Sequence, residues 1–176
     1  MNSLKRLYNW TLDKANHKNA KWYLSIISFA ESSFFPIPPD LLLIPMALAS
    51  KTKAIFYAFI CTFSSVLGGI LGYAIGYFFY NTLGIYIVEF YHLENSFSVF
   101  EDYYKEFGIL IVLGAGITPF PYKFITIASG VFGLNIFLFI IISIVGRGLR
   151  FYLIAILLYF FGEKIKLIID KYFNIL

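Results

Sequence analysis

The sequence predicts an all-α integral membrane protein with a single membrane domain over residues 1–176. Three observations support this fold class: 60% of the residues are hydrophobic, 21% are aromatic and only 14% are charged. Soluble domains contain about 45–50% apolar and about 25% charged residues. Since each helical crossing takes roughly 20 residues, the chain has room for only a few spans.

Residues 1–21 form a basic segment that we expect in the cytoplasm or at the membrane interface. The segment is too polar to contain the apolar region of a cleavable signal, so we expect it to stay in the protein. Its cationic residues are Lys5, Arg6, Lys14, Lys18 and Lys21.

Residues 22–50 are apolar but are interrupted by prolines in the stretch "FPIPPD". The arms on either side, 22–35 and 39–50, can each enter the bilayer but are too short to cross it. The pattern predicts a re-entrant helical hairpin that enters and leaves on one side of the membrane. The alternative is one kinked span of about 28 residues. The residues expected to break the helix are Pro36, Pro38 and Pro39.

Residues 54–80 are uninterrupted and predict a full transmembrane helix. Small residues recur along it at every fourth position, which lets a second helix approach closely. We expect a packing face here, with a substrate-lining groove as the second interpretation. The stripe consists of Ser64, Gly68, Gly72 and Gly76, with Ser65 and Gly69 beside it. Cys61, on the same helix, is expected to be a small buried hydrophobic residue.

The second half of the chain repeats this order of elements. Residues 84–107 are acidic and aromatic, which predicts interfacial helices. Residues 108–133 predict a second re-entrant hairpin, broken at Pro119 and Pro121 within "TPFPYK". Residues 134–161 predict a second transmembrane helix, and 162–176 form a basic tail.

The charge distribution indicates the topology. If only 54–80 and 134–161 cross the membrane, the N-terminus, Lys51, Lys53 and the basic tail share one side, and the acidic segment lies on the other. This positive-inside pattern predicts a multi-pass membrane protein with both termini in the cytoplasm.

The two proline-containing breaks align at an offset of 83 residues, which places Pro36 on Pro119 and Asp40 on Lys123. Each break leads through a short apolar arm into a long span. The sequence therefore predicts two units of inverted topology, an arrangement typical of alternating-access transporters.

Five ionisable residues lie within apolar segments, where each costs about 2.5–3.5 kcal/mol on insertion scales. They are Glu31, Asp40, Lys123, Arg147 and Arg150. We expect the three cations to bind an anion, because arginines can hold a phosphate bidentately and helix N-termini at a break favour negative charge. We expect the two carboxylates to load and release protons. The alternative is that these charges pair structurally or reach an interface.

Other classes of function have little support in the sequence. The two histidines, His17 and His92, are not spaced as metal ligands, and no catalytic or phosphate-loop motif is present. We therefore expect no enzyme, metal or cofactor. The basic residues lie beside membrane segments, which argues against nucleic-acid binding. The sequence leaves homo-oligomerisation open.

Four stretches resemble the DedA family of membrane proteins, also called SNARE-associated or VTT-domain proteins, in its short YqaA-like branch. They are "FAESSFFPIPPDLLLIPMALA", "SSVLGGILGYAIGYF", "GITPFPYKFITIASGVF" and "GRGLRFYLIA". The resemblance covers roughly residues 22–160. It implies a protein of the plasma (inner) membrane with two facing re-entrant loops, a role in envelope integrity and a link to the proton-motive force. Typical members carry an Arg shortly before the second proline motif, where this chain has "GAGITP".

The resemblance also implies functional positions and substrates. The embedded acidic positions of the family fall on Glu31 and Asp40, and its basic positions fall on Lys123, Arg147 and Arg150. Relatives move undecaprenyl phosphate or scramble phospholipids. We therefore expect a flippase-type transporter of an anionic lipid or polyprenyl phosphate, coupled to protons. The alternatives are a proton-coupled ion or small-solute transporter and a non-transporting scaffold.

Overall fold

The computed structural model describes residues 19–35, 37–92 and 94–175. The predicted helix break at Pro36 and most of the basic N-terminal segment lie outside the described residues. The described residues form helices and no strands, as the sequence predicts. In chain order these are α2 (Ala20–Glu31), α3 (Asp40–Ala49), the 3-10 turn η1 (Lys51–Lys53), α4 (Ala54–Phe79), the π-helical turn η2 (Tyr80–Gly84), α5 (Ile85–Phe90), α6 (Glu94–Ile117), α7 (Tyr122–Val131) and α8 (Ile136–Ile175).

Two helices are long and apolar enough to cross a membrane. One is the 40-residue run Lys51–Phe90, which contains α4, and the other is the 27-residue run Ile136–Gly162, the first part of α8. A hydrocarbon core about 30 Å thick needs about 20 helical residues, so both exceed this length. Both coincide with the spans expected at 54–80 and 134–161, which supports a membrane protein.

The element boundaries differ from the prediction in three places. α6 is one helix across the expected junction between residues 107 and 108, because Gly108 is a single glycine that weakens a helix without ending it. α4 continues through η2 into α5, so residues 84–90 extend the long helix instead of forming a separate interfacial one. α8 continues into the basic tail, where the sequence has no proline to stop it.

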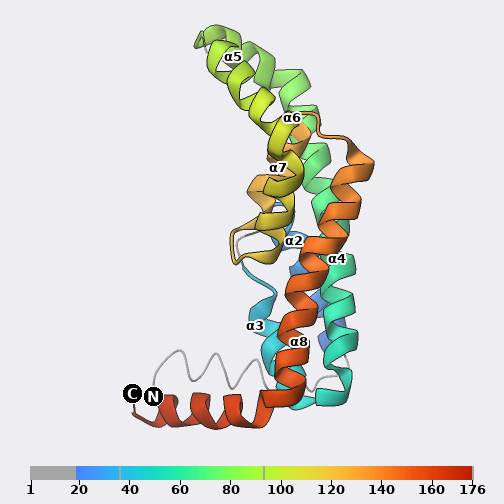
Figure 1. The fold of residues 1–176 in the computed structure, drawn as a ribbon, viewed down its shortest axis with the longest axis vertical. Coiled ribbons are helices and arrows are strands. Elements are labelled where there is room, and N and C mark those ends of the chain that lie inside the picture. The colour runs from blue at the N-terminus through green and yellow to red at the C-terminus, as the bar shows by residue number, and fades with distance from the viewer. Residues whose placement is uncertain (1–18, 36, 93, 176) are drawn as a thin grey trace.

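α4 and α8 lie side by side along the long axis of the molecule, and the shorter helices cover them (Figure 1). α2 and α7 pack against α4, whereas α6 and α3 pack against α8. α2 ends and α7 begins at mid-height, α2 rising from the lower end and α6 descending from the upper end (Figure 1). The links that contain Pro38, Pro39, Pro119 and Pro121 thus lie near the middle of the molecule.

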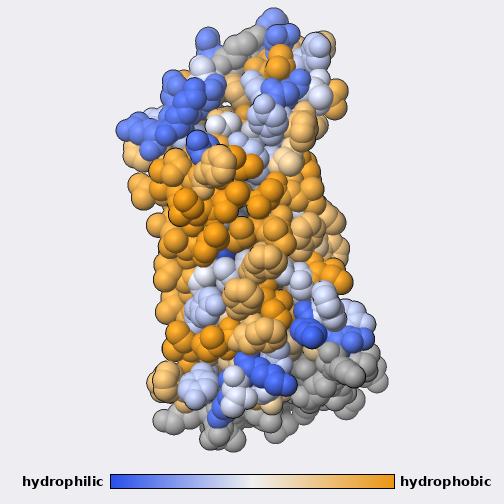
Figure 2. Space-filling view, turned by 90° about the vertical axis from the view of Figure 1, so that its right-hand side faces the viewer, coloured by the Kyte–Doolittle hydropathy of each residue, from blue (hydrophilic) through white to orange (hydrophobic). Residues whose placement is uncertain are grey.

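Charge and hydropathy follow this long axis. The turn η1, which contains Lys51 and Lys53 and joins α3 to α4, lies at the lower end of the view, where the last part of α8 also turns aside (Figure 1). The acidic residues of α5 and early α6 lie at the upper end. A broad apolar belt separates hydrophilic residues at both ends of the face in Figure 2. Large exposed apolar side chains of α4 and α8, such as Phe63, Leu67 and Phe137, suit contact with lipid.

Two apolar clusters lie on either side of mid-height. The lower one joins α2, α3, α4 and α8 around Leu24, Met46 and Phe151. The upper one joins α6, α7 and α8 around Val112, Tyr122 and Phe139. A polar cluster lies between them and contains most of the embedded charges predicted from the sequence.

Candidate functional site

Glu31 and Arg147 form a buried ion pair at the centre of the molecule. Glu31 is the last residue of α2, and Arg147 lies within Ile136–Gly162, the apolar part of α8. Nη2 of Arg147 lies 2.6 Å from Oε2 of Glu31, and the two side chains are 1% and 10% exposed. A charge buried this far from water costs several kcal/mol unless it is paired and hydrogen-bonded.

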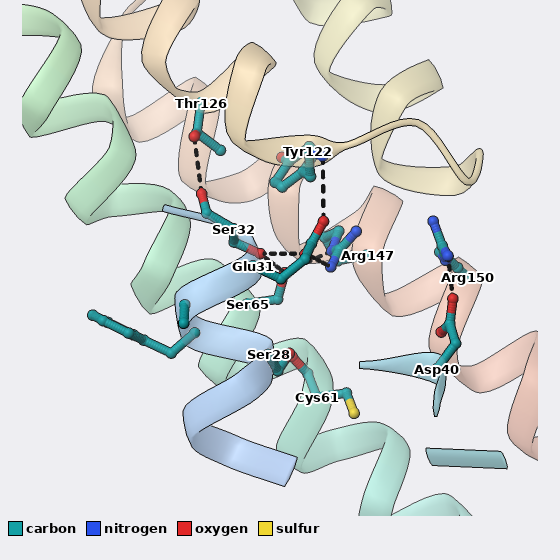
Figure 3. Close-up of polar contacts among 12 residues, drawn as sticks. Ser28, Glu31, Ser32, Asp40, Cys61, Ser65, Tyr122, Thr126, Arg147 and Arg150 are labelled. Carbon is teal, nitrogen blue, oxygen red and sulfur yellow. Dashed lines mark hydrogen bonds and ion pairs between the residues drawn. The ribbon is translucent and has the colours of Figure 1, made fainter. Parts of the chain in front are cut away.

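Two serines complete a ring of four side chains with this pair (Figure 3). Nε of Arg147 donates to Oγ of Ser65, on α4, at 2.6 Å. Oγ of Ser65 lies 2.6 Å from Oγ of Ser32, and Ser32 donates to Oε2 of Glu31 at 3.1 Å. The ring joins α2, α4 and α8, and every polar contact in it lies out of water.

The carboxylate of Glu31 also lies at the N-terminus of α7. The N–H of Tyr122 donates to Oε1 of Glu31 at 3.3 Å. This N–H is one of the donors that the first turn of a helix cannot pair internally, and the N-cap residue, Pro121, provides no side-chain acceptor. A side-chain carboxylate from another helix therefore takes the place of the N-cap, where the helix dipole favours negative charge.

Aromatic rings enclose the guanidinium of Arg147 on two sides. Its Cζ lies 4.9 Å from the centre of the Tyr122 ring and 4.7 Å from that of Phe151. The hydroxyl of Tyr122 is in turn hydrogen-bonded to Ser143, at 2.7 Å. Cation–π contacts of this kind fix the plane of the guanidinium and so direct its N–H groups at Glu31 and Ser65.

Asp40 and Arg150 form a second ion pair, one helical turn further along α8. Arg150 donates from Nη2 to Oδ2 of Asp40, the first residue of α3, and from Nη1 to the carbonyl oxygen of Thr118. These side chains are more open than the first pair, at 11% and 19% exposed. Oδ1 of Asp40 is buried and has no hydrogen-bond partner. A buried polar atom without a partner is uncommon in folded proteins.

Of the five predicted charges, the structure brings four together as two acid–base pairs, and Lys123 lies apart from them. Lys123 is half-buried, and its Nζ lies 5.4 Å from the centre of the Phe124 ring. It forms no ion pair with any described residue. Each predicted anion-binding arginine is thus already neutralised by one of the predicted proton-responsive carboxylates.

The prolines and glycines predicted from the sequence surround these pairs. Pro39 and Pro121 immediately precede α3 and α7, and Pro38 and Pro119 lie in the links before them. The glycine stripe faces α2 and α7: a Cβ on Gly68 would lie 2.0 Å from the carbonyl oxygen of Phe29, and one on Gly72 2.2 Å from Oγ1 of Thr126. Gly69 lies against the side chains of Phe139 and Thr126, and Gly76 against the backbone of Ile127.

Sequence analysis missed the neutral members of the site: Ser32, Tyr122 and Thr118. It placed Ser65 beside the packing stripe and did not give it a polar role. The available signal was the polar character of "ESS" within an apolar arm, since buried hydroxyl groups require partners. In the described part of the chain, no group of three or more His, Cys, Asp and Glu side chains is arranged to hold a metal.

Comparison with known proteins identifies relatives of this chain. No family model matches it, and no solved structure does. An uncharacterized protein of Haemophilus influenzae is 40% identical over 159 residues, which cover 90% of this chain and 82% of that protein. An uncharacterized protein of Histophilus somni is 37% identical over 161 residues, with the same two coverages of 90% and 82%. The chain belongs to the family of these two uncharacterized bacterial proteins.

Proposed function

We propose that the protein is a membrane transporter that moves an anionic lipid or a lipid-linked phosphate across the plasma membrane, coupled to protons. One observation carries the proposal: the carboxylate of Glu31 occupies an anion site built by Arg147 and the N-terminus of α7. A guanidinium and a free helix N–H are also the groups that bind phosphate.

The site exchanges its occupant through protonation. When Glu31 takes up a proton it loses its negative charge, and Arg147 and the N–H of Tyr122 become available to an external anion. When the anion leaves, Glu31 ionises and takes its place again. A ligand bound by the protonated site therefore travels with a proton, because the buried guanidinium favours one negative charge at a time.

The pair of Asp40 and Arg150 provides the entrance to this site. Arg150 lies three residues after Arg147, on the same face of α8. Its pair with Asp40 is more exposed than the pair of Glu31 and Arg147. An anion that reaches Arg150 first can then exchange with the carboxylates in turn.

The packing of the helices supports an inverted repeat for this transporter. In the first unit α2 packs on its own span, α4, and in the second α6 packs on its own span, α8. The other short helix of each unit packs on the span of the opposite unit: α7, from the second unit, packs on α4, and α3, from the first, packs on α8. Two re-entrant hairpins of opposite orientation, meeting at mid-height, would produce this pattern. We further propose membership of the DedA family on its four motifs, and a lipid substrate on that resemblance.

The proposed topology predicts where two engineered cysteines can be labelled. In a Cys61→Ser background, Thr52→Cys and Val99→Cys change no charge, and both positions are exposed. Because basic loops stay in the cytoplasm, a membrane-impermeant maleimide is expected to label Val99→Cys in spheroplasts and Thr52→Cys only in inverted vesicles. Labelling of both cysteines from the same side would contradict the topology.

Arg150→Gln is expected to slow lipid transport at least about tenfold, because a charge-assisted contact worth about 1.5–3 kcal/mol is lost. The assay uses phosphatidylcholine vesicles that contain fluorescent phosphatidylglycerol, with quenching of the outer leaflet. Lys105→Gln is the matched control, since it removes the same charge from an exposed surface pair with Glu101. The hydrogen bond to Glu101 raises the pKa of Lys105, so this residue stays charged throughout the assay.

The same vesicles separate the alternatives. Faster flipping by the wild-type protein, lost in Arg150→Gln and retained in Lys105→Gln, supports the proposal. Proton-coupled flux of a small ion or solute without flipping would favour a small-solute transporter. Neither activity would favour a scaffold.

A further inference from the structure

The hydrogen bonds in the central ring have only one consistent direction. A serine hydroxyl carries one proton, and a carboxylate accepts only. The proton of Ser32 goes to Oε2 of Glu31, so the 2.6 Å contact between the serines uses the proton of Ser65. Oγ of Ser65 in turn accepts from Nε of Arg147, at 2.6 Å. Every donor in this chain therefore points from Arg147 towards Glu31.

This direction depends on the charge of Glu31. An ionised carboxylate only accepts, and it fixes both serine protons in one orientation. A protonated carboxyl group can donate to Oγ of Ser32, which then donates to Ser65. The proton of Ser65 must then turn away from Ser32, and the acceptor that Ser65 offers to Nε of Arg147 changes with it.

We propose that Ser32 and Ser65 are positioning residues that tie the orientation of Arg147 to the protonation state of Glu31. The two residues act through Arg147 and Glu31 and need not touch the transported anion. The inference rests on the proposed transport function and adds a path by which proton uptake on α2 is transmitted to α8. Arg147 donates from Nε to Ser65 and from Nη2 to Glu31. Protonation of Glu31 therefore alters both of these hydrogen bonds at once.

Other charged and titratable groups face the same centre. Tyr122 approaches from α7, and Arg147 and Arg150 from α8. Asp40 on α3 and Cys61 on α4 lie in the same region (Figure 3). Of these groups, Arg147 alone hydrogen-bonds to either serine in the described part of the chain, so changes confined to the serines test the relay itself.

The experiment compares Ser32→Ala, Ser65→Ala and their combination with Ser25→Ala. Ser25 is the matched control, because its hydroxyl bonds to Ser64 at 2.7 Å on the same α2–α4 contact but outside the ring. Ser32→Ala removes a donor to the Glu31 carboxylate, and Ser65→Ala removes the donor that orients Ser32, so under the relay either change favours proton uptake at higher pH. The midpoint of the pH profile of transport is expected to rise by about one unit in each ring variant and to stay unchanged in Ser25→Ala.

The combined variant distinguishes a relay from two independent contacts. The two serines act in one series of hydrogen bonds, so removing either one already breaks it. The Ser32→Ala, Ser65→Ala double variant is therefore expected to shift the midpoint of the pH profile no further than the larger single change. Shifts that add, or a Ser65→Ala profile equal to that of Ser25→Ala, would overturn the relay. Ser65→Cys keeps a weak donor and is expected to give a smaller shift. It replaces Ser65→Ala if that protein does not fold.

A second measurement separates this inference from the proposed function. Infrared difference spectra follow protonation of Glu31 directly, with Glu31→Gln used to identify its band. If the wild-type protein moves no lipid, the transport proposal fails, yet the infrared midpoint still has to rise in Ser32→Ala and Ser65→Ala. Infrared midpoints equal to the wild-type value in both variants would overturn the relay whatever the transport result.

Discussion

Arg147→Met is expected to lower the free energy of unfolding by about 3–5 kcal/mol and to abolish transport, because it leaves the buried carboxyl group of Glu31 without its partner. Arg147 is the largest fully buried side chain among the described residues, and its exposed fraction is 1%. The substitution also removes the guanidinium group that hydrogen-bonds to Ser65 and lies against the rings of Tyr122 and Phe151. Denaturant unfolding in detergent micelles measures the loss.

Glu31→Gln in the Arg147→Met background separates the charge from the packing. The double variant contains no buried charge at this position, so it is expected to regain most of the lost stability while remaining inactive in transport. Arg147→Lys keeps the charge but cannot reach Glu31 and Ser65 with two separate nitrogens in one plane. An Arg147→Met protein as stable as the wild type would show that the pair contributes nothing to the fold.

The sequence was sufficient to predict the long helices and the charged members of the site. Residues 54–80 and 134–161 are apolar over more than the roughly 20 residues that a helix needs to cross a bilayer. Apolar runs of this length are typical of transmembrane helices. Glu31, Asp40, Arg147 and Arg150 were conspicuous because a charge in an apolar segment is costly. Lys123 met the same criterion and yet lies apart, since cost alone does not identify a partner.

The pairing of these charges could not be read from the sequence. Glu31 and Arg147 are 116 positions apart, and only the crossing of α2, α4 and α8 brings them together. The role of Ser65 depends on which face of α4 meets α2, and the N–H of Tyr122 belongs to the backbone, which carries no sequence signal. The continuity of α6 across Gly108 was missed because charge composition changes there while helix propensity does not.

Gly76→Ala is expected to destabilise the protein by about 3 kcal/mol and to impair transport, although it adds a single methyl group. A Cβ at Gly76 would lie 2.0 Å from the carbonyl oxygen of Ile127 on α7. The approach is mutual, because a Cβ at Gly130 on α7 would lie 2.0 Å from the carbonyl oxygen of Tyr73 on α4. Neither backbone can give way locally, so α7 must move as a whole.

Gly114→Ala on α6 is the matched control for this effect. A Cβ at Gly114 meets nothing within 4 Å, so alanine is expected to be neutral or to stabilise the helix by up to about 1 kcal/mol. Thermal unfolding of both variants in the same detergent gives the comparison. Equal stability of the two proteins would contradict the close contact of α4 and α7.

The displacement of α7 by Gly76→Ala also reaches the ion pair. α7 begins at Tyr122, whose N–H holds Oε1 of Glu31 and whose ring covers Arg147. A shift of this helix lengthens both contacts at once, and Thr126, which donates to the carbonyl oxygen of Ser32 at 2.9 Å, moves with it. Transport by Gly76→Ala should therefore fall even at temperatures where the protein remains folded. A folded variant with the wild-type rate would show that the position of α7 does not control the anion site.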